Sequence, residues 1–377
     1  MKKAVLIPDS FKGTLSSTEI CSIMKERIHT YYPGCEVVSI PVADGGEGSV
    51  DAFLTAVGGE KITLTVENPY FEPMKSFYGL IDGGKTAVIE MAGCAGLPLV
   101  EDRKDPRKTT TYGVGKLILA AAGRGISKLV VGLGGSATND GGAGAMAALG
   151  ARFLDADGRT LAPNGASLRR IASIDLSHMH PRLAHARFTA LCDVNSPLTG
   201  PLGATMTYGP QKGASTPALL GELEAGMENY ARVLRRAFPG RDVEFPGAGA
   251  AGGLGAACAL FLGAALKPGA EAVRDLTGFD MLLRGADLAV TGEGRADAQS
   301  VRGKAVAAVA ARCKKAGVPL IALVGSAGPG ADALLGCGVT KLLEVTPDGC
   351  PPPDRAAAHY RAAADRFFCA LAAEKRR

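Results

Sequence analysis

Both ends of this chain alternate short apolar segments with loops and helices, and this pattern constrains the fold most. Near the N-terminus, the pattern predicts a strand at Lys3–Pro8 and a second strand at Glu36–Pro41. Between them, a capping box at Ser16–Glu19 predicts the start of a helix. Near the C-terminus, Asp287–Val290 and Leu320–Val324 read as strands separated by a helical segment. Alternating strands and helices predict a parallel sheet with crossover helices.

The middle of the chain has a different pattern, with a tight turn at Asp82–Lys85 between two short apolar segments. Two like ends around a different middle predict one discontinuous domain with an insertion. We therefore expect two α/β domains with the active site in the cleft between them. Residues 1–65 and 286–377 would form a Rossmann- or flavodoxin-like parallel-sheet domain, and residues 66–285 an inserted mixed α/β domain.

Composition excludes several classes of protein. Among 377 residues, 47% are hydrophobic and 21% charged, which is enough apolar material for a large core. The net charge of +5 is spread along the chain and there is no Trp, so we expect no nucleic-acid partner. The uncharged stretch Pro246–Leu266 is rich in Gly and Ala, which favours a buried helix over a membrane span. Nine cysteines without a CxxC pair indicate reduced thiols and a cytoplasmic location.

Two common nucleotide-binding patterns occur in unsuitable contexts. Gly79–Thr86 fits the P-loop expression, but a strand-like segment follows it, so we expect a hairpin. Gly247–Gly252 fits the dinucleotide fingerprint, but Pro246 interrupts the short apolar run before it. An NAD(P)-dependent or non-catalytic nucleotide-binding protein that uses Gly247–Gly252 remains the alternative function.

Polar residues follow each of the first two expected strands. Asp9, Ser10 and Lys12 follow the first strand, and Asp44 and Glu47 lie in a glycine-rich loop after the second. The carboxyl ends of parallel strands meet at one edge of a sheet, where ligands of open α/β sheets bind. A lysine there could neutralise phosphate oxygens. The alternative is a pair of ordinary exposed loops.

A longer loop, Gly132–Gly142, follows a buried strand and precedes a helix of small residues. Its free amides and hydroxyls could form an anion nest, and its acidic residue could hold a metal ion or a substrate hydroxyl. A tight turn that requires positive φ angles is the alternative. The candidate binding residues here are Gly135, Ser136, Thr138, Asn139 and Asp140.

Two further strand ends carry carboxylates. Asp193 and Asn195 follow the apolar segment Phe188–Leu191, where a carboxylate could accept a proton from a hydroxyl or hold Mg²⁺. Near the C-terminus, Glu293, Arg295 and Asp297 follow another strand, and such a trio suits Mg²⁺ together with phosphate. The alternative for the trio is a surface ion pair.

Taken in order, seven segments resemble the bacterial glycerate kinases almost from end to end. Each segment alone is weakly specific, and the specificity comes from their order. The segments are Pro8–Gly13, Val42–Gly48, Gly134–Gly142, Cys192–Asn195, Tyr208–Gly213, Gly249–Gly255 and Thr291–Arg295. This chain departs from the family pattern at Thr14, where a Ser is expected, and in a long Ala-rich C-terminal helix.

The resemblance implies transfer of the γ-phosphoryl group of ATP to a hydroxyl of D-glycerate, with Mg²⁺ and without a P-loop. The product favoured is 2-phosphoglycerate. The chain would then be a phosphotransferase with an alcohol acceptor, whose oligomeric state the sequence leaves open.

Phosphoryl transfer requires alignment, charge neutralisation and a proton acceptor. We expect Lys12 to contact the transferring phosphoryl group or the glycerate carboxylate, Asp193 to act as the base and Arg295 to stabilise developing charge. Glu293 and Asp297 would hold Mg²⁺. The loop from Ser136 would bind either ATP phosphates or the substrate. The binding residues expected are Asp9, Ser10, Asp44, Glu47, Gly135, Ser136, Thr138, Asn139, Asp140 and Asn195.

Overall fold

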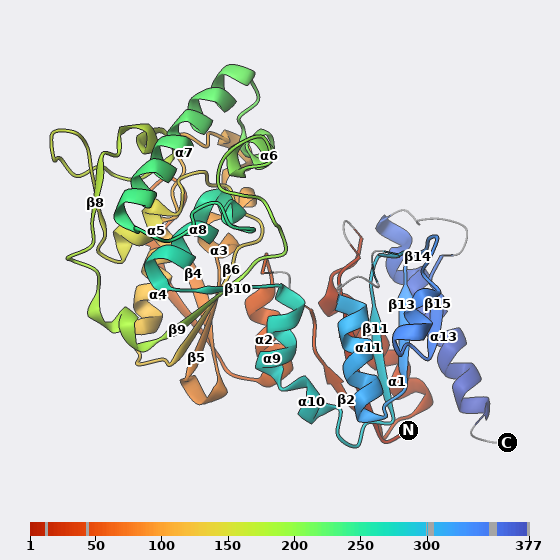
Figure 1. Ribbon diagram of the computed structural model, residues 1–377. Helices are drawn as coiled ribbons and strands as arrows, with labels where there is room; N and C mark the ends of the chain where they lie inside the picture. The colour runs from red at the N-terminus through yellow and green to blue at the C-terminus, as the bar shows by residue number, and fades with distance from the viewer. Residues whose placement is uncertain (12–13, 43–44, 299, 301–304, 347–352, 375–377) are drawn as a thin grey trace. The chain divides into compact units, whose positions relative to one another are not determined.

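The structure is a computed structural model that describes residues 1–11, 14–42, 45–298, 300, 305–346 and 353–374 (Figure 1). The chain divides into two compact units, Met1–Ala43 with Ala270–Arg377 and Asp44–Gly269. These limits differ from those expected after residues 65 and 285. Helix α2 (Ser49–Val57) accounts for the first difference because it packs on the inserted sheet, where a β-carbon on Gly79 would lie 3.1 Å from Val50 Cγ1.

The first unit contains a five-stranded, wholly parallel sheet in the order β15-β13-β11-β1-β2. Its strands are β1 (Lys3–Pro8), β2 (Glu36–Ser39), β11 (Leu288–Gly292), β13 (Leu320–Val324) and β15 (Lys341–Glu344). Numbered along this unit, the order is 2-1-3-4-5, which is that of flavodoxin-like doubly wound sheets. The parallel sheet predicted from both ends of the chain is confirmed.

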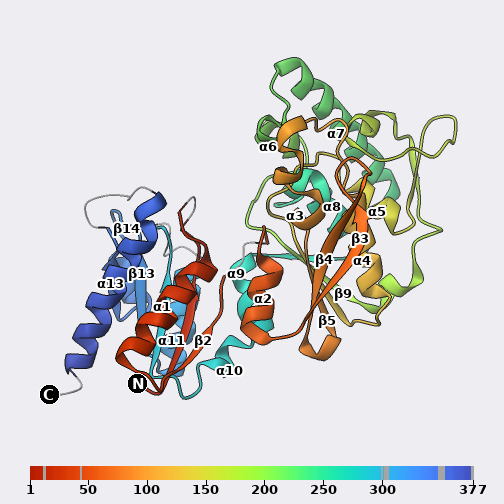
Figure 2. The same ribbon diagram turned by 180° about the vertical axis from the view of Figure 1, so that it is seen from behind.

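Helices cover both faces of this sheet. Helices α1 (Ser17–Tyr31) and α13 (Pro353–Glu374) pack on one face, and α11 (Ala305–Ala316) lies on the other (Figures 1 and 2). The predicted capping box is present, because Ser16 accepts from the Glu19 amide and the Glu19 carboxylate accepts from the Ser16 amide. The remaining elements here are α10 (Phe279–Leu282), α12 (Ala333–Cys337), β12 (Arg295–Ala296) and β14 (Ser326–Ala327), and α9 (Gly269–Thr277) starts at the boundary.

The second unit contains a six-stranded mixed sheet in the order β10-β9-β6-β5-β4-β3. Its strands are β3 (Glu60–Glu67), β4 (Pro73–Ile81), β5 (Thr86–Glu90), β6 (Lys128–Gly132), β9 (Arg187–Leu191) and β10 (Ala265–Lys267). Strands β3, β4 and β5 pair antiparallel, and β5, β6, β9 and β10 pair parallel. The P-loop-like segment is therefore the β4–β5 hairpin, with Ile81 opposite Thr86, as the sequence predicts.

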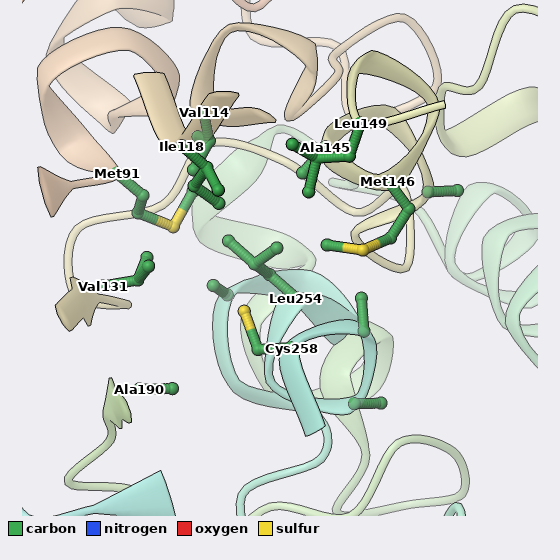
Figure 3. Close-up of a cluster of buried hydrophobic side chains, with 14 of the residues drawn as sticks. Met91, Val114, Ile118, Val131, Ala145, Met146, Leu149, Ala190, Leu254 and Cys258 are labelled. Atoms are coloured by element: carbon green, nitrogen blue, oxygen red, sulfur yellow. The ribbon is translucent and has the colours of Figure 1, made fainter. Parts of the chain in front are cut away.

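Helices α4 (Tyr112–Ala122), α5 (Ala143–Ala148) and α8 (Ala250–Leu262) bury the core of this unit. Figure 3 shows this core, in which side chains from the strand ends, α4, α5 and α8 meet: Met91, Val114, Ile118, Val131, Ala145, Met146, Leu149, Ala190, Leu254 and Cys258. The uncharged stretch thus contains the predicted buried helix, which spans residues 250–262. None of the helices in the described parts of the chain is long and apolar enough to cross a membrane.

Smaller elements complete the second unit. They are α3 (Ala92–Ala95), α6 (Ala204–Tyr208), α7 (Pro217–Ala237), β7 (Arg152–Leu154), β8 (Ser173–Asp175) and the 3₁₀ helices Asp82–Gly84, Leu97–Arg103, Gly165–Arg170, Pro181–His185 and Pro210–Lys212.

Candidate functional site

Two predicted loops pack together at the carboxyl ends of β6 and β9, where Gly132 pairs with Leu191. The Gly134 amide donates to the Gly45 carbonyl at 3.0 Å. A β-carbon on Gly134 would lie 2.7 Å from the Gly46 α-carbon, so only glycine permits this backbone contact. Asp193 follows the end of β9 at the same edge. The structure therefore brings the Gly45–Gly48 loop, the long glycine-rich loop and Asp193 to one sheet edge.

The solvent-facing part of the long loop is short. Gly135 is exposed with a φ of 73°, Gly134 is half-buried, and Ser136 is 8% exposed. The Gly135 carbonyl accepts from the Leu97 amide at 2.9 Å. A ligand at this edge would therefore meet residues 134–136 first.

The inner part of this loop is organised around Asp140, which is 0% exposed. Its carboxylate accepts hydrogen bonds from the Thr111 amide and hydroxyl at 2.7 and 2.8 Å, and from the Gly142 and Gly144 amides at 3.0 and 3.1 Å. Burial raises the pKa of Asp140, against the lowering effect of these bonds. These contacts join the loop to α4 and to the first turn of α5. Thr138 and Asn139 are also 0% exposed.

A buried lysine supports the loop from within. Lys212, in the 3₁₀ helix Pro210–Lys212, is 1% exposed, and its ammonium group donates to Ser136 Oγ and to the Thr138 carbonyl, both at 2.8 Å. Burial lowers the pKa of Lys212 to about 7, although the Asp140 charge acts in the opposite direction. The sequence interpretation included Lys212 in a family segment but gave it no role, because nothing local distinguishes it from a surface lysine.

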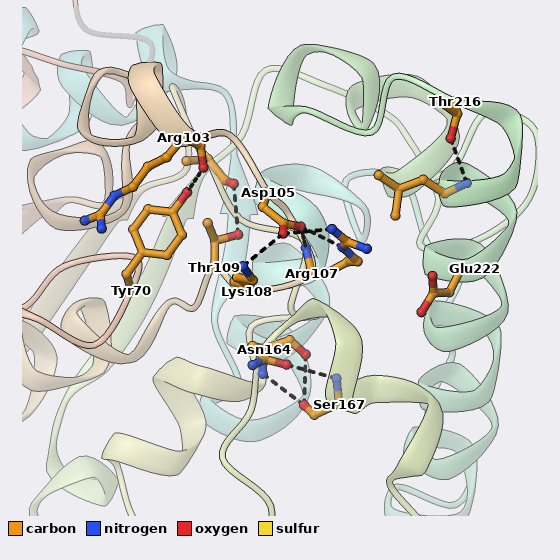
Figure 4. Close-up of polar contacts among 12 residues, drawn as sticks. Tyr70, Arg103, Asp105, Arg107, Lys108, Thr109, Asn164, Ser167, Thr216 and Glu222 are labelled. Atoms are coloured by element: carbon orange, nitrogen blue, oxygen red, sulfur yellow. Dashed lines mark hydrogen bonds and ion pairs between the residues drawn. The ribbon is translucent and has the colours of Figure 1, made fainter.

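A second support is the threonine run before α4. Thr109, which is labelled in Figure 4, donates from Oγ1 to the Ala137 carbonyl at 3.1 Å. Thr111 binds Asp140 as described above. The preceding turn is held by Asp105, whose carboxylate accepts from the Arg107 amide at 3.1 Å and from the Arg107 side chain. Bonding to Arg107 lowers the pKa of Asp105. The sequence interpretation missed these threonines, and no motif marks them.

The dinucleotide-like segment supports the loop from the other side. Ala251, Gly252 and Gly253 all have positive φ angles, and the Gly141 amide donates to the Gly252 carbonyl at 2.8 Å. Residues 238–249, all described, contain no strand, so the segment lacks the strand that the fingerprint requires. Its glycines permit close packing against the loop.

The other candidates of this unit lie on the surface. Glu47, Asp193 and Asn195 are exposed, and Asp193 Oδ1 accepts from the Gly269 amide at 3.1 Å. Glu90, which the sequence interpretation missed, ends β5 and is 4% exposed. It accepts from the Val50 amide at 3.0 Å, and burial raises its pKa. Asp44 lies outside the described residues.

A separate group of candidates occupies the carboxyl edge of the parallel sheet in the first unit. Pro8 of β1 pairs with Gly292 of β11, and the Asp9 amide donates to the Gly292 carbonyl at 2.9 Å. Asp9 and Glu293 thus directly follow neighbouring strands. In the order 2-1-3-4-5 these are strands 1 and 3, between which the connections change direction and ligands bind.

The rest of that group lies on the loop after β11. Arg295 is exposed in β12, which pairs with β14. Asp297 is half-buried, and its amide donates to Ser300 Oγ at 3.1 Å. Ser10 is half-buried, and its amide donates to the Asp9 carboxylate at 2.7 Å. Lys12 lies outside the described residues. Within the described ranges, no three His, Cys, Asp or Glu side chains form a group that could hold a metal ion.

Comparison with known proteins decides the family. The profile of the Glycerate kinase family matches residues 4–368. The chain belongs to the glycerate kinase family. It is 42% identical over 353 residues to a glycerate kinase of Bacillus subtilis (strain 168), covering 93% of this chain and 92% of the relative. It is 43% identical over 325 residues to a glycerate 2-kinase of Escherichia coli (strain K12), covering 86% and 85%.

The fold of this glycerate kinase is similar to a solved structure. The crystal structure of a candidate glycerate kinase 2 from Salmonella typhimurium LT2 has a TM-score of 0.85 and 36% identity, covering 100% of both chains. The resemblance drawn from the seven segments is therefore confirmed. The protein is a kinase that phosphorylates an alcohol group, glycerate kinase activity is its function, and a kinase implies ATP as phosphoryl donor.

Proposed function

We propose that this glycerate kinase transfers the γ-phosphoryl group of ATP to the 2-hydroxyl of D-glycerate, forming 2-phosphoglycerate. The observation that carries the proposal is the meeting of the Gly45–Gly48 loop, the Gly134–Ser136 segment and Asp193 at one sheet edge. This edge supplies backbone amides, a hydroxyl and a carboxylate. The E. coli relative named glycerate 2-kinase supports the choice of hydroxyl.

The Gly134–Ser136 segment would bind an anionic group, either the ATP phosphates or the carboxylate of glycerate. The Gly135 amide and the Ser136 hydroxyl are suitable donors for such oxygens, whereas the Gly134 amide already donates to the Gly45 carbonyl. Thr138, Asn139 and Asp140 lie beneath this segment and would act on the ligand by fixing the loop. Asp44 and Glu47, in the adjoining loop, would contact the substrate.

Asp193 is the proposed base. Its exposed carboxylate would accept the proton of the glycerate hydroxyl while that oxygen attacks the γ-phosphorus and the bond to ADP breaks. The Gly269 amide, which donates to Asp193 Oδ1, would hold the carboxylate in place. Asn195 would orient the same hydroxyl.

We assign the neutralisation of the negative charge on the substrates to basic residues of the first unit. Lys12 would contact the transferring phosphoryl group or the glycerate carboxylate, and Arg295 would stabilise the charge that develops during transfer. Asp9 and Ser10, at the point where the connections of the sheet change direction, would bind the ligand beside them.

Glu293 and Asp297 are the proposed Mg²⁺ ligands. Their carboxylates are hard oxygen donors, and Mg²⁺ commonly binds one or two carboxylates together with substrate phosphates. The chemistry of the two carboxylates therefore suits such an ion. This mode of binding needs no group of three protein ligands, and the described residues contain none. When bound, Mg²⁺ would neutralise phosphate charge.

A coupled ADP-release assay with D-glycerate tests the activity, and phosphorus NMR of the product identifies the hydroxyl. We expect Asp193→Asn to lower kcat by about a thousandfold with intact folding. Asp157→Asn, a change of the same kind at a distant exposed residue, should leave it unchanged. Near-normal turnover of Asp193→Asn would remove Asp193 as base, and absence of ADP release with a change in NAD(P)H absorbance would favour the dinucleotide alternative.

A further inference from the structure

The contact between Lys212 and Ser136 has a defined direction. The charged ammonium group has three donors and no acceptor, so Ser136 Oγ accepts a hydrogen bond from Lys212 Nζ at 2.8 Å. The hydroxyl hydrogen of Ser136 must then point elsewhere. Among the described residues, none accepts a hydrogen bond from it. Ser136 retains 8% exposure beside the exposed Gly135, so this hydrogen is available to a ligand.

The second bond of Lys212 fixes the same loop. Its ammonium also donates to the Thr138 carbonyl at 2.8 Å, so one cation joins two positions of the loop. Because Lys212 is 1% exposed, water and salt weaken these bonds little. The buried carboxylate of Asp140 balances the charge from the other end of the loop.

We propose that Lys212 is a positioning residue that directs the Ser136 hydroxyl outward, as a hydrogen-bond donor to an anionic oxygen of the bound ligand. This inference rests on the proposed function, in which Gly134–Ser136 binds a phosphate of ATP or the carboxylate of glycerate. Lys212 acts through Ser136 and does not itself touch the ligand.

The titration of Lys212 gives the inference a distinctive consequence. The groups that face its ammonium are Ser136, the Thr138 carbonyl, the Asp140 charge and the ring of Tyr208, whose centroid is 6.0 Å from Nζ. With a pKa of about 7, Lys212 loses its proton in mildly alkaline solution. The neutral amine can accept the Ser136 hydrogen, which then no longer points to the ligand.

The test compares Lys212→Met, Ser136→Ala and the double variant with the wild type in steady-state assays. The matched control is Lys75→Met, at an exposed lysine in β4 of the same unit. We expect Lys212→Met and Ser136→Ala each to raise the KM of the same substrate, either ATP or glycerate, about tenfold, with a smaller effect on kcat. The double variant should be no worse than Lys212→Met, because both changes remove one interaction. A changed KM for ATP identifies a phosphate as the anion, and a changed KM for glycerate identifies the carboxylate.

The pH dependence separates this role from a purely structural one. In the wild type the affected KM should rise with pH above about 7, and this rise should be absent in Ser136→Ala and Lys212→Met. Additive effects of the two substitutions on KM, or a rise of KM with pH that persists in Ser136→Ala, would overturn the inference. If Lys212→Met does not fold, the dependence of KM on pH in Ser136→Ala decides between the two roles. A wild type without ADP release would instead overturn the proposed function.

Discussion

The α-carbon of Gly252 lies so close to the Thr138 carbonyl that a β-carbon on Gly252 would be 2.0 Å from that oxygen. The backbone at Gly252 also has a φ of 65°, which residues other than glycine rarely adopt. The start of α8 and the glycine-rich loop are therefore held together at the level of the backbone. This contact explains why the dinucleotide-like segment has a glycine at position 252, and the explanation does not require a bound nucleotide.

Gly252→Ala should therefore destabilise the protein strongly. We expect a loss of about 3 kcal/mol or more in the free energy of unfolding, because the β-carbon forces the two backbones apart. Gly263→Ala is the matched control, since Gly263 ends the same helix with a φ of 63° and has nothing within 4 Å of an added β-carbon. It should cost about 1 kcal/mol, from the backbone conformation alone. Equal losses in chemical denaturation would contradict the packing argument.

The elements that the sequence predicts well carry their signals locally. The capping box of Ser16 and Glu19 depends on neighbouring residues, and the hairpin at Gly79–Thr86 depends on a tight turn between apolar segments. The seven segments that resemble the glycerate kinases are likewise recognised from their residues and their order along the chain. These features therefore need no knowledge of the tertiary fold.

The features that the sequence does not predict arise from tertiary packing. Nothing near Lys212 in the sequence shows that its side chain is buried and that its ammonium group contacts Ser136 and Thr138 of a distant loop. Glu90 similarly becomes a buried acceptor only when α2 lies against β5. The same packing of α2 moves the first unit boundary from the expected position.

The buried hydrogen bonds to the Asp140 carboxylate should stabilise the folded protein. Asp140→Asn replaces one acceptor oxygen by a donor that faces the Thr111 and glycine amides, so we expect a loss of about 3 kcal/mol in unfolding free energy. Asp157→Asn, at a 69% exposed side chain paired with Arg159, should change it by less than about 0.5 kcal/mol. Thermal unfolding of both variants checks this, and similar midpoints would show that the Asp140 network is dispensable.

The depressed pKa of Lys212 predicts a pH dependence of stability. Between pH 7 and about 10.5, the unfolded chain keeps the Lys212 proton while the folded protein has lost it. The free energy of unfolding therefore rises with pH across this window, because the unfolded state binds more protons. Lys212→Met lacks this contribution. Urea denaturation should show the wild type gaining stability relative to Lys212→Met as pH increases from 7 to 10, and a constant difference would contradict the lowered pKa of Lys212.

Lys85 provides a test of the P-loop-like segment. It is exposed at the end of the β4–β5 turn, and its carbonyl accepts from the Ser127 and Lys128 amides at 2.8 and 3.1 Å. Because this turn has no helix N-terminus after it, we expect Lys85→Ala to change the KM for ATP by less than about twofold. A large rise in this KM, with KM for glycerate unchanged, would return the segment to consideration as a phosphate site.

Glu293→Gln tests the proposed metal ligands. The substitution keeps the size of the side chain but removes the negative charge that Mg²⁺ prefers, so the Mg²⁺ concentration for half-maximal activity should rise about tenfold or more. Glu36→Gln is the matched control, because Glu36 begins β2 at the amino end, opposite to the edge where Glu293 follows β11. It should leave the Mg²⁺ requirement unchanged. If Glu293→Gln lowers kcat at every Mg²⁺ concentration without shifting the half-maximal point, Glu293 acts on the substrate rather than on the metal ion.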